Sequence, residues 1–448
     1  MMHMLVRTTL VTAFCFIVLP QAAKAQFGGG ALGTFEPEGV FIDSDKVLRT
    51  RKLADGDELK KLMQKAIRHR PGNEELVYIS LPRLFAEARE LIDAGKPLPD
   101  EMKYLGGMVR LRYVFVDAQA DDLVIAGPAE PFDQPVGGRM VGQLTGRPVL
   151  QLDDLVVALR TCGPGRAGRA FGCKIELTNQ IGQRMVDAWH RHQGTAAVSP
   201  RKRPQIAQKI SEAGGEQQVV LFQQQADTRF ALVTVEADYM LKRLVLGLDR
   251  YPVIRSYLSL LHKPQVASNR FWFEASYDPL LVDPGGRAYE IRGQSLKIST
   301  RGTSIHDDSE TKNPLAERYA RTVTRQYDDL SKLIPSFADL ANLSDLSLLA
   351  ALIGRDKLHQ KADLDLDWVL AQDGYPVAKV DVPESAASLA NIHQNGRVVM
   401  FMAGGVLLDY DPTLKQREQD EQQTLDERTP RIGHGQWLDR QEPPSRRR

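Results

Sequence analysis

The apolar residues of this chain recur with two different periods, and this restricts its fold more than any other feature. A helical period holds in residues 81–92, 181–192 and 315–330, where apolar side chains fall on one face. Alternation of apolar and polar residues, typical of half-buried strands, holds in 108–117 and 269–300. Because the two kinds of segment are mixed along the chain, we expect an α+β fold of two mixed α/β domains with mainly antiparallel sheets.

At 448 residues the chain exceeds the usual size of one domain, so boundaries are expected where composition and periodicity change. The expected segments are a signal peptide (1–25), a flexible glycine-rich lead-in (26–39), an N-terminal α+β domain (40–193), a linker (194–204), a central α+β domain (205–310), a helical segment (311–360), C-terminal strands ending in a small hairpin (361–412) and a disordered tail (413–448). The tail is rich in charged residues, glutamine and proline, a composition that cannot bury a core.

Three local predictions are specific enough to test. Residues 108–117 and 123–126 should pair as a hairpin. Residues 229–235 are predicted as a strand, followed by a helix over about 238–246. Residues 397–409 are predicted as the closing hairpin, with its turn at Ala403-Gly404-Gly405.

The N-terminus has the features of a secretory signal peptide. Arg7 precedes sixteen residues without a charged side chain (8–23), and Ala23-Lys24-Ala25 places small residues where signal peptidase cleaves. An uncleaved membrane anchor is the alternative, but the apolar run is shorter than a spanning helix needs. We expect cleavage before Gln26 and a periplasmic or secreted protein.

The charge balance of the mature chain excludes some partners. Without Arg7 and Lys24 the chain has 56 basic and 57 acidic side chains. A dedicated nucleic-acid-binding protein has a strong basic excess, so no nucleic-acid partner is expected. No later charge-free run reaches the length of a membrane span, so no span is expected after cleavage.

Residues 163–168, Gly-Pro-Gly-Arg-Ala-Gly, match the dinucleotide-binding pattern G-x-G-x-x-G. That loop must follow a strand and open a helix, whereas here a helix-like segment precedes it and a strand-like segment follows. Cys162 and Cys173 flank the loop, and in an oxidising compartment they are expected to form a disulfide. Two free buried thiols, or a cofactor loop, are the alternatives. No cofactor is expected.

Metal-binding patterns are incomplete in the sequence. His190 and His192 are two residues apart, so on a helix they point in different directions. Asp363, Asp365 and Asp367 resemble the start of a calcium loop, but the glycine and glutamate that such a loop needs are missing, and the alternation instead suggests a half-exposed strand. No metal site is expected, and no nucleophile motif is present.

Two groups of residues remain as candidate sites. Asp238, Tyr239, Lys242 and Arg243 form a polar cluster, in which Asp238 could cap a helix and pair with Lys242 one turn later; a catalytic role is the alternative. On a strand, Arg270, Trp272 and Glu274 share the face opposite Phe271 and Phe273. This face is either the solvent-exposed side of a core strand or a strip that binds a ligand or partner.

Several long phrases resemble one protein family. They are YLGGMVRLRYVFVDAQADDLVIAGPAEPF (104–132), TGRPVLQLDDLVVALRT (145–161), EADYMLKRLVLGL (236–248) and YDDLSKLIPSFADLANLSDLSLLAALI (327–353). They are similar to a family of exported bacterial proteins of unknown function, of planctomycete type. The resemblance implies export, in agreement with the signal peptide, and implies no catalytic residue or ligand.

These observations leave two functions. The first is a non-catalytic binding or scaffold protein of the cell envelope or extracellular space, with an unknown protein or envelope ligand as partner. The second is a hydrolase-like enzyme whose acid and base carboxylates lie far apart in the sequence. A deep pocket with several titratable groups of shifted pKa would favour the enzyme, and a flat aromatic surface would favour binding.

Overall fold

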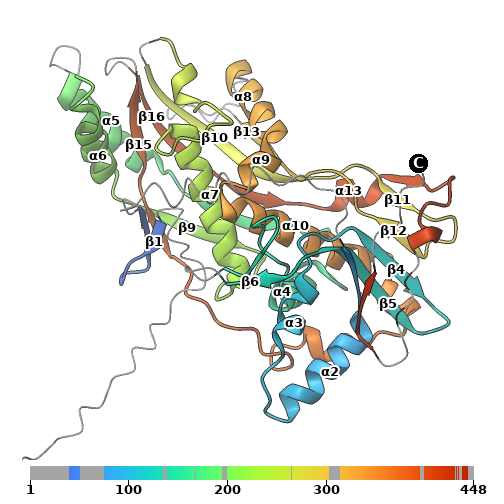
Figure 1. The fold of residues 1–448 in the computed structure, drawn as a ribbon. Helices are drawn as coiled ribbons and strands as arrows, with labels where there is room; N and C mark the ends of the chain where they lie inside the picture. The colour runs from blue at the N-terminus through green and yellow to red at the C-terminus, as the bar shows by residue number, and fades with distance from the viewer. Residues whose placement is uncertain are drawn as a thin grey trace, which may run out of the picture.

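Two large β-sheets form the framework of the protein, and each combines strands from distant parts of the sequence (Figure 1). The computed structural model describes residues 40–50, 75–134, 139–166, 168–193, 199–263, 265–301, 313–393, 398–428, 430, 432 and 436–441. Most neighbouring strands are antiparallel, and helices are interspersed among them without a regular βαβ repeat. The predicted α+β class is confirmed.

In the described residues the larger sheet has nine strands, and β16 lies near its centre between β8 and β10. Its order is β1 (Val40–Ile42), β2 (Val47–Thr50), β14 (Ser385–Ala387), β9 (Glu216–Phe222), β8 (Phe171–Ile175), β16 (Val398–Leu408), β10 (Gln265–Ser276) and β13 (Ser295–Arg301), and β15 (Ala390–His393) also pairs with β16. The β10–β16 pair is parallel over ten residue pairs, from Gln265 opposite Val398 to Glu274 opposite Leu407.

The second sheet has seven strands among the described residues. Its order is β17 (Arg417–Gln419), β11 (Leu280–Val282), β12 (Ala288–Glu290), β4 (Tyr113–Asp117), β5 (Asp122–Ala129), β3 (Glu75–Ser80) and β18 (Leu438–Gln441). A short pair, β6 (Phe132–Asp133) with β7 (Val141–Gly142), is separate. The β4–β5 pair confirms the predicted hairpin.

Three helices pack together in the main hydrophobic core: α4 (Leu152–Cys162), α7 (Arg229–Leu246) and α10 (Pro335–Arg355). The other helical elements are α2 (Leu81–Asp93), α3 (Asp100–Lys103), η2 (Leu105–Gly107), α5 (Asn179–Gln193), α6 (Arg203–Gly214), η3 (Leu258–Leu260), α8 (Pro314–Arg325), α9 (Tyr327–Ser331), α11 (Leu358–Lys361), α12 (Asp367–Leu370), α13 (Asp411–Lys415) and η4 (Asp426–Arg428). The predicted helical segment over 311–360 therefore contains α8, α9, α10 and all but the last residue of α11.

Helix α10 is largely apolar and is buried on all sides by the protein. It alone among the described helices is long and apolar enough to cross a membrane, and 94% of the relevant window is buried inside the protein. A helix that is hydrophobic all round is typical of either a membrane span or the centre of a large core. Here the contacts of α10 with α4 and α7 account for its composition.

The two faces of the larger sheet are covered differently. One face carries α7, which contacts β8, β10 and β16 (Figure 1). At one end of the sheet, α5 and α6 pack together on a smaller core that includes Val399 and Phe401 of β16. The candidate binding strip lies on the rest of that second face.

The predicted strand at 229–235 is wrong, because these residues form the first half of α7. Thr228 caps this helix by accepting a hydrogen bond from the backbone N of Ala231 at 3.2 Å, so the helix starts nine residues earlier than Asp238. The segment is buried on all sides, and a continuous apolar run does not distinguish a strand from a core helix.

The predicted closing hairpin is also wrong. Residues 398–408 form one continuous strand, β16, and Gly404 and Gly405 lie within it. A Cβ atom at Gly405 would lie 2.6 Å from the ring of Trp272, so glycine is required by close packing across the sheet rather than by a turn. The half-exposed strand suggested at 363–367 is absent too, since Asp367 begins α12.

The strands do not follow the predicted division into domains. The larger sheet takes strands from the segments 40–193, 205–310 and 361–412, and the smaller sheet is equally mixed. The described part of the predicted disordered tail supplies β17 and β18, which pair with β11 and β3. Backbone pairing at sheet edges, which composition does not reveal, orders these short polar segments.

Some predictions lie outside the described residues. These are the signal peptide over 1–25 and the lead-in over 26–39. Of the predicted linker, residues 199–204 are described and lead into α6.

Candidate functional site

Cys162 and Cys173 are free and buried, so the predicted disulfide is wrong. Cys162 ends α4, and its Sγ lies 3.3 Å from the carbonyl oxygens of both Ala158 and Ser347, either of which can accept the thiol hydrogen. Cys173 lies in the middle of β8, next to α7. Burial raises the pKa of each thiol to about 12, which makes both unreactive. The two thiols do not pair: Cys162 lies at the end of a helix, and Cys173 lies within a strand of the larger sheet.

The glycine loop connects a helix to a strand, in the order that the sequence predicts. Helix α4 ends at Cys162 and β8 begins at Phe171. This order is the reverse of that of a dinucleotide loop. Gly165 and Gly168 have positive φ values of 77° and 84°, which glycine adopts without strain, so the glycines serve to turn the chain.

The predicted polar cluster lies on α7 inside the protein. Lys242 Nζ lies 2.5 Å from Asp238 Oδ2, which confirms the predicted ion pair. Arg243 instead binds Asp249 through two hydrogen bonds of 2.6 Å each. Burial raises the pKa of Asp238 and of Tyr239. Asp238–Lys242 and Arg243–Asp249 are thus two separate pairs, and the Tyr239 hydroxyl has no hydrogen-bond partner among the described residues, so the four residues do not form one accessible site.

The candidate strip on β10 has the predicted alternation. Phe271 and Phe273 are buried in the core, whereas Arg270, Trp272 and Glu274 are half-buried on the opposite face. Neighbouring strands continue this face in rows. One row runs Ser299, Trp272, Gly405, Lys174, Val220, and the next runs Lys297, Glu274, Leu407, Gly172, Phe222.

Two glycines lie beside the aromatic rings of this face. A Cβ atom at Gly405 would lie 2.6 Å from the ring of Trp272, and one at Gly172 would lie 3.2 Å from that of Phe222. Both would also meet the backbone of a neighbouring strand, at 2.2 Å from the carbonyl oxygen of Cys173 and 1.9 Å from that of Val406, so both positions require glycine. We call the half-buried residues Val220, Phe222, Trp272, Glu274 and Leu407, together with Lys174, the open sheet face.

A buried ionic cluster joins three helices, and no sequence motif reveals it. Its members are Arg139, Asp154 of α4, Arg229 and Glu236 of α7, and Asp339 of α10. Arg139 lies 2.7 Å from Glu236 and 2.8 Å from Asp339, and Arg229 pairs with Asp154 and Asp339. Three carboxylates share two guanidinium groups. Burial raises the pKa of Asp154 to about 7, in spite of the attraction of Arg229.

A second buried network surrounds Arg110. Its Nε lies 2.9 Å from Asp345, and its Nη2 donates to the hydroxyl of Ser295 at 2.7 Å. Asp345 also accepts hydrogen bonds from Ser295 and Tyr277 at 2.7 and 2.9 Å. Burial lowers the pKa of Arg110, but Asp345, Tyr277 and Asp328 together raise it by more, so Arg110 stays charged.

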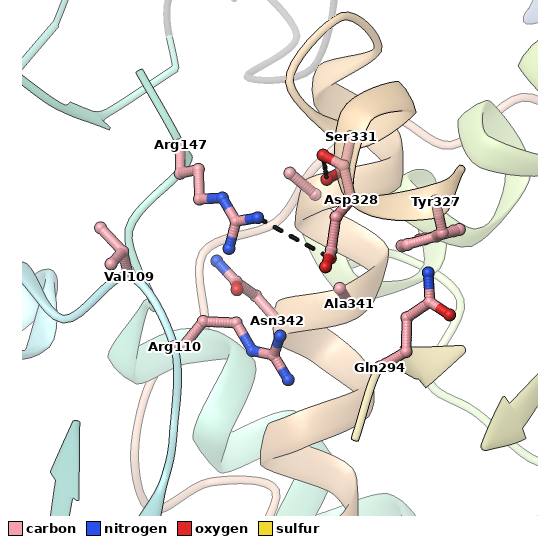
Figure 2. Close-up of a pocket in the computed structure, with 10 residues that line it drawn as sticks. Val109, Arg110, Arg147, Gln294, Tyr327, Asp328, Ser331, Ala341 and Asn342 are labelled. Carbon is pink, nitrogen blue, oxygen red and sulfur yellow. Dashed lines mark hydrogen bonds and ion pairs between the residues drawn. The ribbon is translucent and has the colours of Figure 1, made fainter. Parts of the chain in front are cut away.

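Arg110 also lines a small cavity, shown in Figure 2. Its volume is about 10 Å³, and its walls include Val109 and Arg147 on one side and residues of α9 and α10 on the other. The Arg147 guanidinium points towards Asp328, with 3.8 Å between Nη2 and Oδ1 (Figure 2). We call this cavity the arginine pocket.

The sequence contains no local signal for either the ionic cluster or the arginine pocket. Arg110 and Asp345 are 235 positions apart, and Arg147 and Asp328 come from different predicted segments. The only available hint is a polar residue within an apolar run, such as Asp345 in the leucine-rich stretch of α10. Such a residue needs a buried partner, but the sequence does not identify it.

Comparison with known proteins gives one family match. The model of a family described as a protein of unknown function (DUF1598) matches residues 173–257, which run from β8 to beyond α7. No curated protein and no solved structure matches the chain. The predicted resemblance is thus supported as a domain of unknown function in this segment, which contains Lys174, Val220 and Phe222 of the open sheet face and Asp238 to Arg243 of α7.

Proposed function

We propose that this protein is a non-catalytic binding protein of the cell envelope or extracellular space, and that the open sheet face is its binding surface. The observation that carries this proposal is the flat aromatic floor formed by Trp272 and Phe222 over two glycines. Large rigid aromatic rings contribute much of the energy of binding at interfaces. Lys174 and Glu274 add charges of both signs among the rings, which suits a ligand with polar and apolar surfaces.

The positions of the titratable groups support binding over catalysis. Asp154 and Asp238 have raised pKa values, but both lie in the core and are paired with Arg229 and Lys242. A general acid or base must come within hydrogen-bonding distance of its substrate. Neither carboxylate lines the arginine pocket, which is itself too small to enclose a drug-sized substrate.

Co-sedimentation with the insoluble cell-envelope fraction of the source bacterium tests this proposal. Wild-type protein should pellet with that fraction, and Trp272→Ala should weaken the affinity about thirtyfold or more, since a central aromatic anchor contributes roughly 2 kcal/mol or more. Trp368→Ala is the matched control because Trp368 is also half-buried but lies elsewhere, beside Tyr375. This control should bind like wild type.

The same assay can reject the proposal. Equal pelleting of Trp272→Ala and wild type would show that the open sheet face is not the binding surface. Absence of wild-type binding, together with turnover of chromogenic ester, phosphate or glycoside substrates, would favour the hydrolase alternative.

We also propose export, which rests on the sequence of residues 1–25. The mass of the protein purified from its own cells should correspond to a chain that begins at Gln26. An intact Met1 in the exported fraction would contradict this.

A further inference from the structure

We propose that the arginine pocket binds one carboxylate group of a larger ligand. This proposal concerns a site separate from the open sheet face and does not depend on the function proposed above. It rests on the placement of two guanidinium groups, one fixed and one adjustable, around a cavity that admits only a small group.

Arg110 is the fixed cation. Its side chain is 9% exposed, and Asp345, Ser295 and Gly293 hold it through Nε and Nη2. Among the described contacts of Arg110, none uses Nη1, so this nitrogen retains its hydrogens for a group in the pocket. Tyr277 and Ser295 hold Asp345 in turn, which keeps the guanidinium in one orientation.

Arg147 is the adjustable cation, because its only described ionic partner is distant. A closed guanidinium–carboxylate hydrogen bond measures roughly 2.7–2.9 Å. The Arg147–Asp328 separation is 3.8 Å, and the Asp328 side chain is 64% exposed. Asp328 therefore lies at the mouth of the pocket without closing on Arg147. Its position shows that a carboxylate can approach this guanidinium, and a ligand carboxylate can take its place with two parallel hydrogen bonds.

The size of the pocket determines how much of a ligand can enter. A volume of about 10 Å³ holds roughly one water-sized group. Val109, Ala338 and Ala341 form an apolar part of the wall, and Asn342 is held by its hydrogen bond to the carbonyl oxygen of Pro148 at 2.8 Å. Only one oxygen of a carboxylate fits inside, so the rest of that group and of the ligand stays at the mouth, beside Arg147. The described ionic partner of Arg147 is itself a carboxylate, that of Asp328, and this favours a ligand carboxylate over a phosphate.

Titration with sodium butyrate, followed by ligand-observed NMR at constant ionic strength, tests the proposal. Arg147→Gln should weaken butyrate binding at least about tenfold, because it removes a charge-assisted pair of hydrogen bonds. Asp328→Asn should tighten binding about threefold or more, because it removes the internal competitor. Opposite effects of the two variants are not expected from a general loss of structure.

Asp329→Asn is the matched control. It removes the same charge one residue away, where Asp329 pairs with Lys332 at 2.9 Å, and it should leave butyrate affinity within about twofold of wild type. The comparison of Asp328→Asn with Asp329→Asn remains decisive if Arg147→Gln does not fold. Equal affinity in these two variants would overturn the proposal. Tighter binding of inorganic phosphate than of butyrate would overturn the assignment to a carboxylate.

Discussion

Asp154 shows how the interior of this protein sets the behaviour of a single side chain. Its carboxyl group lies in the ionic cluster, where three acids share Arg139 and Arg229. Burial, and then the nearby carboxylates of Asp339 and Asp153, raise its pKa to about 7, while Arg229 lowers it. The sequence shows Asp154 only as an acidic residue in the first turn of a helix, a common position that suggests no shift.

The pKa of Asp154 predicts a pH dependence of stability. An unfolded aspartate has a pKa near 3.8, so between about pH 4 and pH 7 the folded state holds a proton that the unfolded state has lost. The resulting stabilisation is complete below pH 4 and is lost as the pH rises through 7. Asp154→Asn cannot ionise, so its free energy of unfolding relative to wild type should rise by about 1–3 kcal/mol from pH 5 to pH 8.

Urea denaturation of both proteins at pH 5 and pH 8 measures this difference. Asp153→Asn is the comparison variant, because the Asp153 carboxylate is one of the charges that raise the pKa of Asp154. Its difference from wild type in free energy of unfolding should rise from pH 5 to pH 8 by less than that of Asp154→Asn. If the free energy of unfolding of Asp154→Asn relative to wild type instead falls from pH 5 to pH 8, the pKa of Asp154 is not raised in the folded protein.

Among the elements, α10 shows how tightly the interior is packed. The helix is buried among α4, α7 and the sheet, and near its C-terminal end Gly354 lies against the glycine loop. A Cβ at Gly354 would be 2.9 Å from the carbonyl carbon of Gly163 and 3.0 Å from the backbone N of Pro164. The glycine loop therefore packs closely against α10. This close approach is possible because the helix residue that faces the loop, Gly354, has no side chain.

Gly354→Ala tests this packing. In an isolated helix alanine is more favourable than glycine by about 1 kcal/mol. Here the new methyl group would meet backbone atoms, which cannot rotate away, so we expect a net loss of about 1–3 kcal/mol in the free energy of unfolding. Guanidinium chloride denaturation measures it. A variant more stable than wild type would show that the loop moves aside without cost.

The whole molecule depends on β16, which joins parts of the chain that the sequence assigns to separate domains. This strand pairs with β8 from the predicted N-terminal domain and with β10 from the predicted central domain. Its side chains Met400, Met402 and Val406 belong to the main core. Neither predicted domain therefore has a complete sheet of its own.

A truncation experiment follows from this arrangement. A fragment of residues 26–310 contains both predicted domains but lacks β16, so we expect it to show no cooperative thermal unfolding by near-UV circular dichroism. A fragment of residues 26–428 lacks only the edge strand β18 and the residues around it, and it should unfold cooperatively. Cooperative unfolding of the shorter fragment would support the predicted domain division instead.

The features that the sequence alone determined are those set by near neighbours in the chain. Periodicity predicts the α+β class, the β4–β5 hairpin and the two faces of residues 270–274, and an i,i+4 spacing predicts the Asp238–Lys242 pair. These contacts depend on backbone geometry over a few residues. The same local reasoning fails at 229–235 and 398–408, where apolar segments fit a helix, a strand or a turn equally well.

How distant segments meet depends on the packing of the whole chain. It separates Cys162 from Cys173, although the chain between them is short, because α4 and β8 pack in different layers. It also brings Arg110 to Asp345 and lays Trp272 across Gly405. Such contacts are selected by the total burial and hydrogen bonding of the folded chain, in which each side chain's partner depends on the placement of all the others.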